Sequence, residues 1–347
     1  MRITFLIGNG FDLNAGLKTR FSDFFKVYCE ETKNDTPAIK QFKEDISTNI
    51  ELWSDFEKQM GEYTIKVAQG IWQDEGLSTE QYYTCIDDFR NKFIIYLNEE
   101  IRRPAVLIMQ DEIREKCQDM LINPFQYLRT GQRERLYNYI KNAQPRPLPV
   151  EYGFVVFNYT DMCEECMGIL GSRTIRGYCD GPIEAVISAD RFVYVHGRLG
   201  SEILLGVDNI SQISNPFLRN DEEFLYSIVK PISNRELESG QDERAKELIE
   251  ASNIIIIYGM SLGETDKSWW RVIADWLLEG KNSGERFLVV YSCDGTTNRS
   301  STRNAVRNQK EVRKKFLEAN EYELEEKDKA YIIDHIFCAL NTDILKI

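Results

Sequence analysis

The chain opens with MRITFLIGNGFDLNAGL, residues 1–17, and this stretch decides the fold. Apolar side chains occupy both faces of Arg2–Ile7, which predicts a short, largely buried strand. The strand runs directly into Gly8-Asn9-Gly10, where two near-adjacent glycines allow the backbone to approach a ligand closely. The helix expected after this turn would direct free N–H groups at an anion.

Two alternatives to a nucleotide site stay open at this turn. One is a plain strand-to-helix turn, and the other is the dinucleotide fingerprint of an oxidoreductase. The fingerprint fits poorly, because Leu13 occupies the place of its third glycine. In addition, no second strand ending in an acidic residue follows within about 20 residues. The turn alone therefore does not distinguish a nucleotide site from these alternatives, and the later segments of the chain are needed for that choice.

The composition excludes several classes of protein. The 347 residues include 43 basic and 56 acidic ones, for a formal net charge of −13. This balance argues against a general nucleic-acid coat and against an anionic-membrane binder, although it leaves room for a local basic pocket. No stretch approaches the ~18 uninterrupted apolar residues of a membrane span, and the run Ile3–Ile7 is too short for a signal peptide. We therefore expect a cytoplasmic protein.

The eight cysteines are scattered along the chain, which predicts reduced thiols. Cys163 and Cys166 form the one suggestive pair, with Cys179 and His196 as the nearest further ligands for zinc. The pair lies in a segment with helical character, where positions i and i+3 share a face in any case. We therefore expect no metal site.

Spacing of apolar residues predicts a large helical insertion after the first strand. The predicted helices cover 38–50, 52–68, 79–100, 105–121 and 132–142. The proline-rich segment Gln144–Pro149 marks the clearest boundary. The sequence thus predicts two domains, a Rossmann-like domain formed by residues 1–35 with 150–347 and a helical insertion over 36–149.

One segment of the insertion has two interpretations. In LWSDFEKQMGEY, residues 52–63, Asp55 is suited to cap a helix whose first turn also carries Glu57. Alternatively, one of these two carboxylates reaches over the glycine turn and joins a site. Both interpretations stay open.

Beyond residue 150, apolar runs alternate with helices, which predicts a mostly parallel sheet in an α/β fold. The strands are predicted over 153–157, 192–195, 202–207, 253–258 and 286–291. Ligands of such sheets bind outside the carboxyl ends of the strands. Four strand ends should therefore share one rim, namely Gly8-Asn9-Gly10, Asn158-Tyr159-Thr160, His196-Gly197 and Gly259-Met260-Ser261.

Two side chains at this rim suit catalysis. His196, one of only two histidines, stands beside a glycine that would leave room for a ligand, and its ordinary pKa suits a general base. Asn158 offers a donor and an acceptor on a short arm, suited to fixing a ribose hydroxyl, a carboxamide or a water. The alternatives are a histidine bonded within the core, which fits His335 better, and a turn-forming asparagine.

The same segments carry a family resemblance. Residues 8–14 (GNGFDLN), 53–57 (WSDFE), 157–160 (FNYT), 196–197 (HG) and 259–266 (GMSLGETD) occur in the order found in the AbiH family of bacteriophage abortive-infection proteins. The resemblance spans residue 1 to about residue 280. More distantly, the order of motifs is similar to that of the sirtuin-like NAD-binding fold.

The resemblance implies a pocket for NAD. Asn158 would position the nicotinamide ribose or the attacking water, His196 would act as the base, and Asp12 would meet ribose hydroxyls or act catalytically. The residues expected to bind the nucleotide are Gly8, Asn9, Gly10, Phe11, Tyr159, Gly259, Ser261 and Asp266. The paired Cys-x-x-Cys zinc ribbon of deacetylating sirtuins is missing after His196, which speaks against peptide deacetylation.

The expected function is anti-phage defence by hydrolysis of NAD to nicotinamide and ADP-ribose, and the alternative is a non-catalytic NAD or ADP-ribose sensor or partner-recruiting module. A nuclease or phosphotransferase is disfavoured because neither a Walker loop nor a suitably spaced acidic metal cluster is present in the sequence. The insertion could serve as a lid, a homo-oligomerisation surface or a sensor for a phage-derived trigger, and its composition does not choose among these.

Overall fold

The computed structural model describes residues 1–46, 53–68, 76–143, 148–167, 172–176, 182–186, 191–263, 266–292, 302–320 and 324–340. Within them, the main sheet has eight strands in the order β10-β9-β8-β1-β4-β6-β5, with β7 also paired to β4. The strands are β1 (Arg2–Ile7), β4 (Leu148–Val156), β5 (Ser172–Arg176), β6 (Pro182–Val186), β7 (Phe192–Tyr194), β8 (Ile254–Tyr258), β9 (Phe287–Ser292) and β10 (Ile336–Leu340). Among the described strands only β5 runs antiparallel to its neighbour, so the predicted Rossmann-like α/β class is confirmed.

Strand β1 lies in the middle of this sheet, between β4 and β8. Its bounds are those predicted, and its residues from Ile3 to Ile7 are buried. The apolar character on both faces follows from this position, since a parallel strand covered by helices on both sides has no solvent face.

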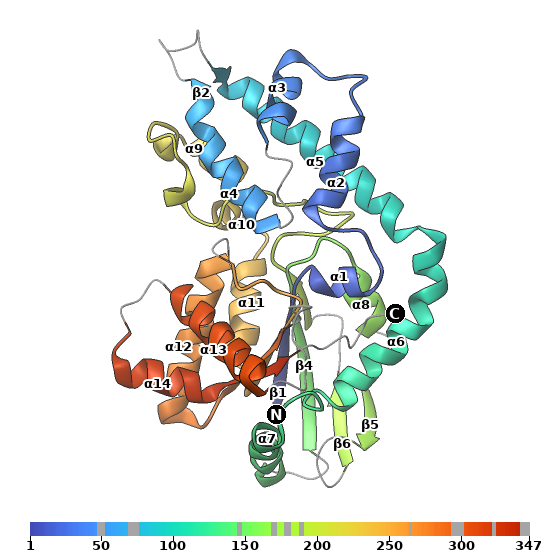
Figure 1. The fold of residues 1–347 in the computed structure, drawn as a ribbon, viewed down its shortest axis with the longest axis vertical. Coiled ribbons are helices and arrows are strands. Elements are labelled where there is room, and N and C mark those ends of the chain that lie inside the picture. The colour runs from blue at the N-terminus through green and yellow to red at the C-terminus, as the bar shows by residue number, and fades with distance from the viewer. Residues whose placement is uncertain are drawn as a thin grey trace.

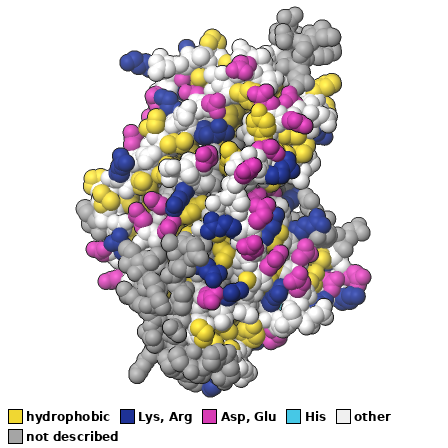
Figure 2. Space-filling model, turned by 180° about the vertical axis from the view of Figure 1, so that it is seen from behind, with side chains coloured by type: hydrophobic (Ala, Val, Ile, Leu, Met, Phe, Trp, Pro, Cys, Tyr) yellow, Lys and Arg dark blue, Asp and Glu magenta, His cyan; other side chains and the backbone are white. Residues whose placement is uncertain are grey.

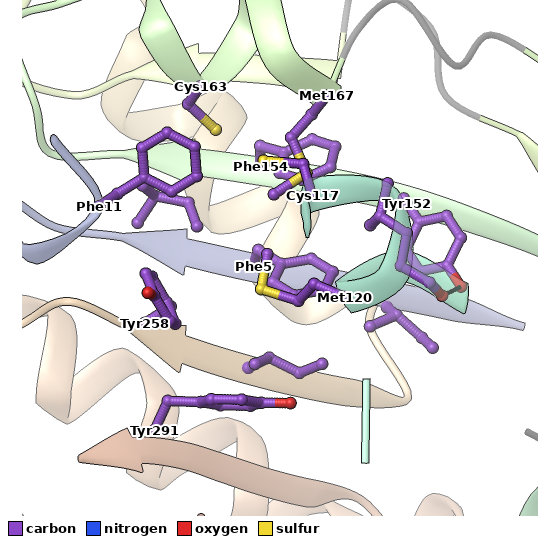
Figure 3. Close-up of a cluster of buried hydrophobic side chains, with 14 of the residues drawn as sticks. Phe5, Phe11, Cys117, Met120, Tyr152, Phe154, Cys163, Met167, Tyr258 and Tyr291 are labelled. Carbon is purple, nitrogen blue, oxygen red and sulfur yellow. Dashed lines mark hydrogen bonds between the residues drawn. The ribbon is translucent and has the colours of Figure 1, made fainter. Parts of the chain in front are cut away.

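Helices cover both faces of the sheet (Figure 1). On one face lie α6 (Pro104–Ile122), α7 (Thr130–Asn142) and α8 (Met162–Met167). On the other face lie α11 (Gln241–Glu250), α12 (Lys267–Ser283), α13 (Thr302–Glu318) and α14 (Glu326–His335). Figure 3 shows part of the first interface, where Phe5 and Phe154 of the sheet meet Cys117 and Met120 of α6.

A second hydrophobic core lies beyond the carboxyl ends of the strands, toward the top of Figure 1. It combines α2 (Phe21–Glu30), α3 (Pro37–Asp45), α4 (Trp53–Tyr63) and α5 (Thr79–Ile101) with α9 (Glu222–Ile228) and the loop before it. We call this assembly the helical layer. The insertion forms helices at the five predicted places, with α6 and α7 packed on the sheet. Two of these helices end earlier than predicted, α3 at Asp45 and α4 at Tyr63, and the strand β2 (Val67–Ala68) occupies the end of the range predicted for the second helix. The strand β3 (Leu77–Ser78) pairs with β2. The proposed domain boundaries stay a prediction.

In the main sheet, four strand assignments differ from the prediction: one predicted strand does not form, and β5, β6 and β10 were not predicted. The strand predicted over 202–207 is wrong, because this segment makes only isolated bridges, Gly197 to Ile203 and Val207 to Val229. Its backbone partners lie on two different segments, so no ladder can extend. Strand β10 was missed because α14 ends at His335 and β10 begins at the next residue, which leaves no turn signal between them.

No helix in the described part of the chain is both long enough and apolar enough to cross a membrane.

Candidate functional site

A cavity of about 750 Å³ lies at the carboxyl ends of the strands, beneath the helical layer. Its floor includes the segments after β1, β4 and β8, as the rim argument predicts. Phe93 and Leu97 of α5 and Glu57 of α4 close it from the helical layer. The volume lies within the range of about 300–1,000 Å³ that small-molecule and cofactor sites occupy.

Most of the predicted site residues line this one cavity. They are Gly8, Asn9, Gly10, Asp12, Asn158, Tyr159, His196, Gly259, Ser261 and Asp266. Phe11 does not line it, because its ring is fully buried in the core and packs edge-on against Tyr258 with centroids 6.2 Å apart. Figure 3 shows Phe11 and Tyr258 together with Cys163 in that core.

The turns after β1 and β8 pack backbone against backbone, and we call them together the glycine wall. A Cβ on Gly8 would lie 2.6 Å from the Gly259 carbonyl oxygen, and one on Gly10 would lie 2.6 Å from the Gly259 Cα. Gly259 itself has a φ of +73°. The glycines are therefore required for the contact between the two turns, whatever they do for a ligand.

The amides of the glycine wall are largely used within the protein. The helix predicted after the first turn, α1 (Gly10–Asn14), has only five residues. The Gly10 amide donates to the Gly259 carbonyl and the Phe11 amide donates to the Gly8 carbonyl, each at 2.9 Å. The Asn9 side chain is held by Thr19, whose hydroxyl donates to its Oδ1 at 2.6 Å. The Gly10 and Phe11 amides are therefore not free to bind an anion, contrary to the expectation for these two groups.

Asn158 and Asp12 form the least satisfied part of the site. Asn158 is 3% exposed, and neither its Oδ1 nor its Nδ2 has a hydrogen-bond partner among the described residues. The Thr160 hydroxyl donates to Asp12 Oδ2 at 2.8 Å, while Asp12 Oδ1 has no partner within the described ranges. Burial raises the pKa of Asp12 to about 7, against the smaller opposing effects of the Thr160 hydroxyl and of the Asn158 amide, which lies near Asp12 without completing a hydrogen bond. Buried polar atoms without partners are costly, so this pair is suited to a polar ligand.

His196 lies beside Asp266. Its Nε2 is 3.9 Å from Asp266 Oδ1, and the ring packs edge-on against Phe157. Burial, helped by the Lys230 charge, holds the pKa of His196 well below its ordinary value, so the ring is neutral at pH 7. Burial also raises the pKa of Asp266 to about 6.

The glycine after His196 does not leave room for a ligand, contrary to the expectation. A Cβ on Gly197 would lie 1.7 Å from the Glu202 carbonyl oxygen, and Gly197 has a φ of +74°. Gly197 therefore serves the turn that carries His196 into the cavity.

A buried ion pair joins the helical layer to α10 (Lys230–Glu236) at the cavity. Lys230 Nζ lies 3.0 Å and 3.1 Å from the two carboxylate oxygens of Glu57, and both side chains are buried. Burial outweighs the Lys230 attraction and raises the pKa of Glu57 to about 7. Burial alone would lower the pKa of Lys230, but Glu57, Asp266 and Asp208 together raise it above its ordinary value.

The structure thus favours the second interpretation of the segment 52–63 for Glu57, which lines the cavity and is also buried in an ion pair. The side chain of Asp55 lies outside the described residues, as do Thr265 and Cys179. Lys230 was missed, because a single lysine before a proline in a polar helix carries no signal of burial.

The charges at the mouth differ from those inside. The mouth carries exposed Arg20 and Lys315 together with Glu311. Inside, the carboxyl groups of Asp12, Glu57 and Asp266 outnumber the single ammonium group of Lys230, which contacts the inner cluster without lining the cavity. Such a cavity suits a ligand with an anionic outer part and a cationic or polar inner part.

In the described residues, no group of three or more His, Cys, Asp or Glu side chains is arranged to hold a metal ion. Cys163 and Cys166 lie on α8, buried in the core next to Cys117.

Comparison with known proteins gives one family assignment. The family model described as "Bacteriophage abortive infection AbiH" matches residues 4–283. No curated protein and no solved structure matches the chain. The more distant resemblance to sirtuins therefore stays a prediction.

Proposed function

The chain belongs to the AbiH family of bacteriophage abortive infection, and from this premise we propose that it hydrolyses NAD⁺ to nicotinamide and ADP-ribose in its cavity. Membership in the AbiH family supports a role in phage defence. The hydrolysis of NAD⁺ is proposed from the residues of the cavity.

The observation that carries the proposal is the group of three buried polar atoms without hydrogen-bond partners among the described residues, Asn158 Oδ1, Asn158 Nδ2 and Asp12 Oδ1. Asn158 offers a buried acceptor and a buried donor, which match a ribose hydroxyl or the nicotinamide carboxamide. Asp12 Oδ1 adds a further buried acceptor within the same cavity. A ligand that supplies these hydrogen bonds would relieve the cost of burying them.

The charge distribution supports the orientation of the substrate. The nicotinamide end of NAD⁺ is a cation, and cleavage of its bond to ribose passes through a transition state with positive charge on the sugar. The inner carboxyl groups of Asp12, Glu57 and Asp266 would stabilise that charge. Arg20 and Lys315 at the mouth would face the diphosphate.

The reaction needs one water and releases one proton. The bond between nicotinamide nitrogen and ribose C1′ breaks, its electron pair leaves with nicotinamide, and a water oxygen bonds to C1′. Neutral His196 would take the proton of that water as the predicted base, and Asp266 beside it, with its pKa raised to about 6, is ionised at pH 7 and would stabilise the imidazolium until the proton is released.

The test is nicotinamide release from NAD⁺ by the full-length protein, followed by chromatography. We expect release by the wild type and at least a tenfold slower release by Asn158→Ala and by His196→Ala. His335→Ala is the matched control, because the second histidine is also buried but lies in a different cluster, beside Arg135. It should release nicotinamide at the wild-type rate.

Three outcomes would contradict the proposal. Undiminished release by both site variants would remove Asn158 and His196 from the mechanism. An equal loss of nicotinamide release in His335→Ala would mean that the variants lose activity because they fold poorly. Tight binding of ADP-ribose by calorimetry, with no release under any condition including phage infection, would favour the non-catalytic sensor instead.

A further inference from the structure

Helix α13 concentrates positive charge in an acidic protein. It carries six basic and two acidic residues, in a chain with a formal net charge of −13. Arg303, Arg307, Lys310 and Lys314 follow one another at helical spacing, so they share one face of the helix. All four side chains are exposed. We call this face the basic stripe.

The basic stripe runs beside the cavity. A neighbouring face of α13 lines the cavity through Asn308, Glu311, Val312 and Lys315. From the helical repeat, these positions lie about 120° around the helix from the basic stripe. The basic stripe therefore lies on the outer surface of α13, and Glu311 is the lining residue nearest to it around the helix.

Little on the protein neutralises the basic stripe. Among the described residues, Arg303, Arg307 and Lys310 form no ion pair, and Lys314 pairs with exposed Glu318 at 3.4 Å. On the face shown in Figure 2, by contrast, acidic and basic side chains are interspersed. The stripe is thus a local positive field on a chain that otherwise repels polyanions.

We propose that the basic stripe binds single-stranded nucleic acid along α13, with one end of the strand at the cavity mouth. From Arg303 to Lys314 the helix rises about 16 Å, at about 1.5 Å per residue. A stacked strand places one phosphate about every 3.4 Å along its axis, so the stripe would face roughly four or five phosphates. A diphosphate alone would leave most of it unused.

A single strand fits better than a duplex, because an unpaired terminal base can enter a cavity that a paired base cannot. This choice of a nucleic acid over another polyanion rests on the proposed nucleotide cavity. The binding itself goes beyond the proposed function. It would be local, so it agrees with the expectation that the protein is no general nucleic-acid coat.

The test is fluorescence anisotropy of the full chain with a labelled, unstructured 12-nucleotide RNA between 50 and 200 mM salt. The wild type should bind, with a slope of log affinity against log salt of roughly −3 for four contacts. Arg307→Glu/Lys310→Glu should bind at least tenfold more weakly and with a shallower slope. Lys26→Glu/Lys40→Glu, which makes the same charge change at exposed positions of α2 and α3, should bind within twofold of the wild type.

Four results would overturn the inference: no binding by the wild type, an equal loss in both double variants, equal affinity for a blunt duplex of the same length, or preferential binding to vesicles of anionic phospholipid. Nicotinamide release by the same proteins separates this proposal from the first. Binding without release by the wild type would contradict only the proposed hydrolysis, and release without binding would contradict only the basic stripe.

Discussion

The glycine wall and the neighbouring segment after β4 differ in how their polar groups are satisfied. In the glycine wall, the amides of Gly8, Gly10 and Phe11 all donate to backbone carbonyls. In the segment after β4, Asn158 keeps both of its amide atoms without a partner within the described part of the chain. We infer from this difference that the wall is a scaffold and that ligand recognition lies with the buried side chains beside it.

The largest effect should come from breaking the ion pair behind those side chains. Lys230→Met leaves Glu57 as an uncompensated buried carboxylate, which should lower the free energy of unfolding by about 3–5 kcal/mol in urea titration at pH 7.5. Glu57→Gln/Lys230→Met removes both charges and should recover most of the loss. A loss below about 1 kcal/mol in the single variant would show that the pair is not buried in solution.

Asn158→Ala should separate function from stability. Nicotinamide release should fall by about 10²–10³-fold, because an orienting group aimed at the reacting bond is lost. The free energy of unfolding should change by less than about 0.5 kcal/mol, since the amide has no partner to lose among the described residues. A large loss of stability would place Asn158 with the scaffold and break the comparison.

Gly259→Ala, in contrast to Asn158→Ala, should lower the stability of the protein. Its Cβ would lie 2.7 Å from the Phe11 backbone nitrogen, at a φ of +73°, so we expect a loss of about 2–3 kcal/mol in the free energy of unfolding. Gly131→Ala on α7, where a Cβ would meet nothing within 4 Å, is the matched control and should be neutral or slightly stabilising. Equal behaviour of the two variants would refute the close packing of the two turns.

Asp12→Asn probes a side chain that links the glycine wall to the segment after β4, through the Thr160 hydroxyl. The pKa of Asp12 is about 7 in the folded protein and ordinary when unfolded, so the folded state binds the extra proton between about pH 4 and pH 7. Wild-type stability is therefore lost as the pH rises through this window. The variant lacks this loss, and at pH 8 it should be more stable than the wild type by about 1–2 kcal/mol.

The expected gain in the free energy of unfolding is smaller than the shift in the pKa of Asp12 would give by itself. The reason is that the Thr160 hydroxyl loses its carboxylate acceptor in the variant. Urea titrations at pH 5 and pH 8 would check the prediction. A difference between variant and wild type that is the same at both values would mean that Asp12 titrates normally.

The cavity is predictable from the sequence because parallel strands bring their carboxyl ends to one edge. Strand runs that end in Gly8, Asn158, His196 and Gly259 therefore indicate where it lies. Apolar runs also predict β1 and β8, since buried parallel strands carry few polar residues.

Other features could not be predicted, for identifiable reasons. Lys230 becomes part of the inner charge cluster through contacts with Glu57, Asp208 and Asp266, all distant in sequence. The neighbours of Phe11 in sequence suggest contact with the ligand, yet the short helix α1 turns its ring into the core. The glycines likewise suggest ligand contact, although the turns themselves require them.

The ion pair between Glu57 and Lys230 spans 173 positions of sequence. Synthesis at about 5–20 residues per second separates the two residues by roughly 9–35 s. Throughout that interval the helical layer lacks Lys230, and the later Asp266 and the Gly259 turn are still missing from the cavity. The proposed hydrolysis of NAD⁺ would therefore be impossible on the ribosome until about three quarters of the chain had been made.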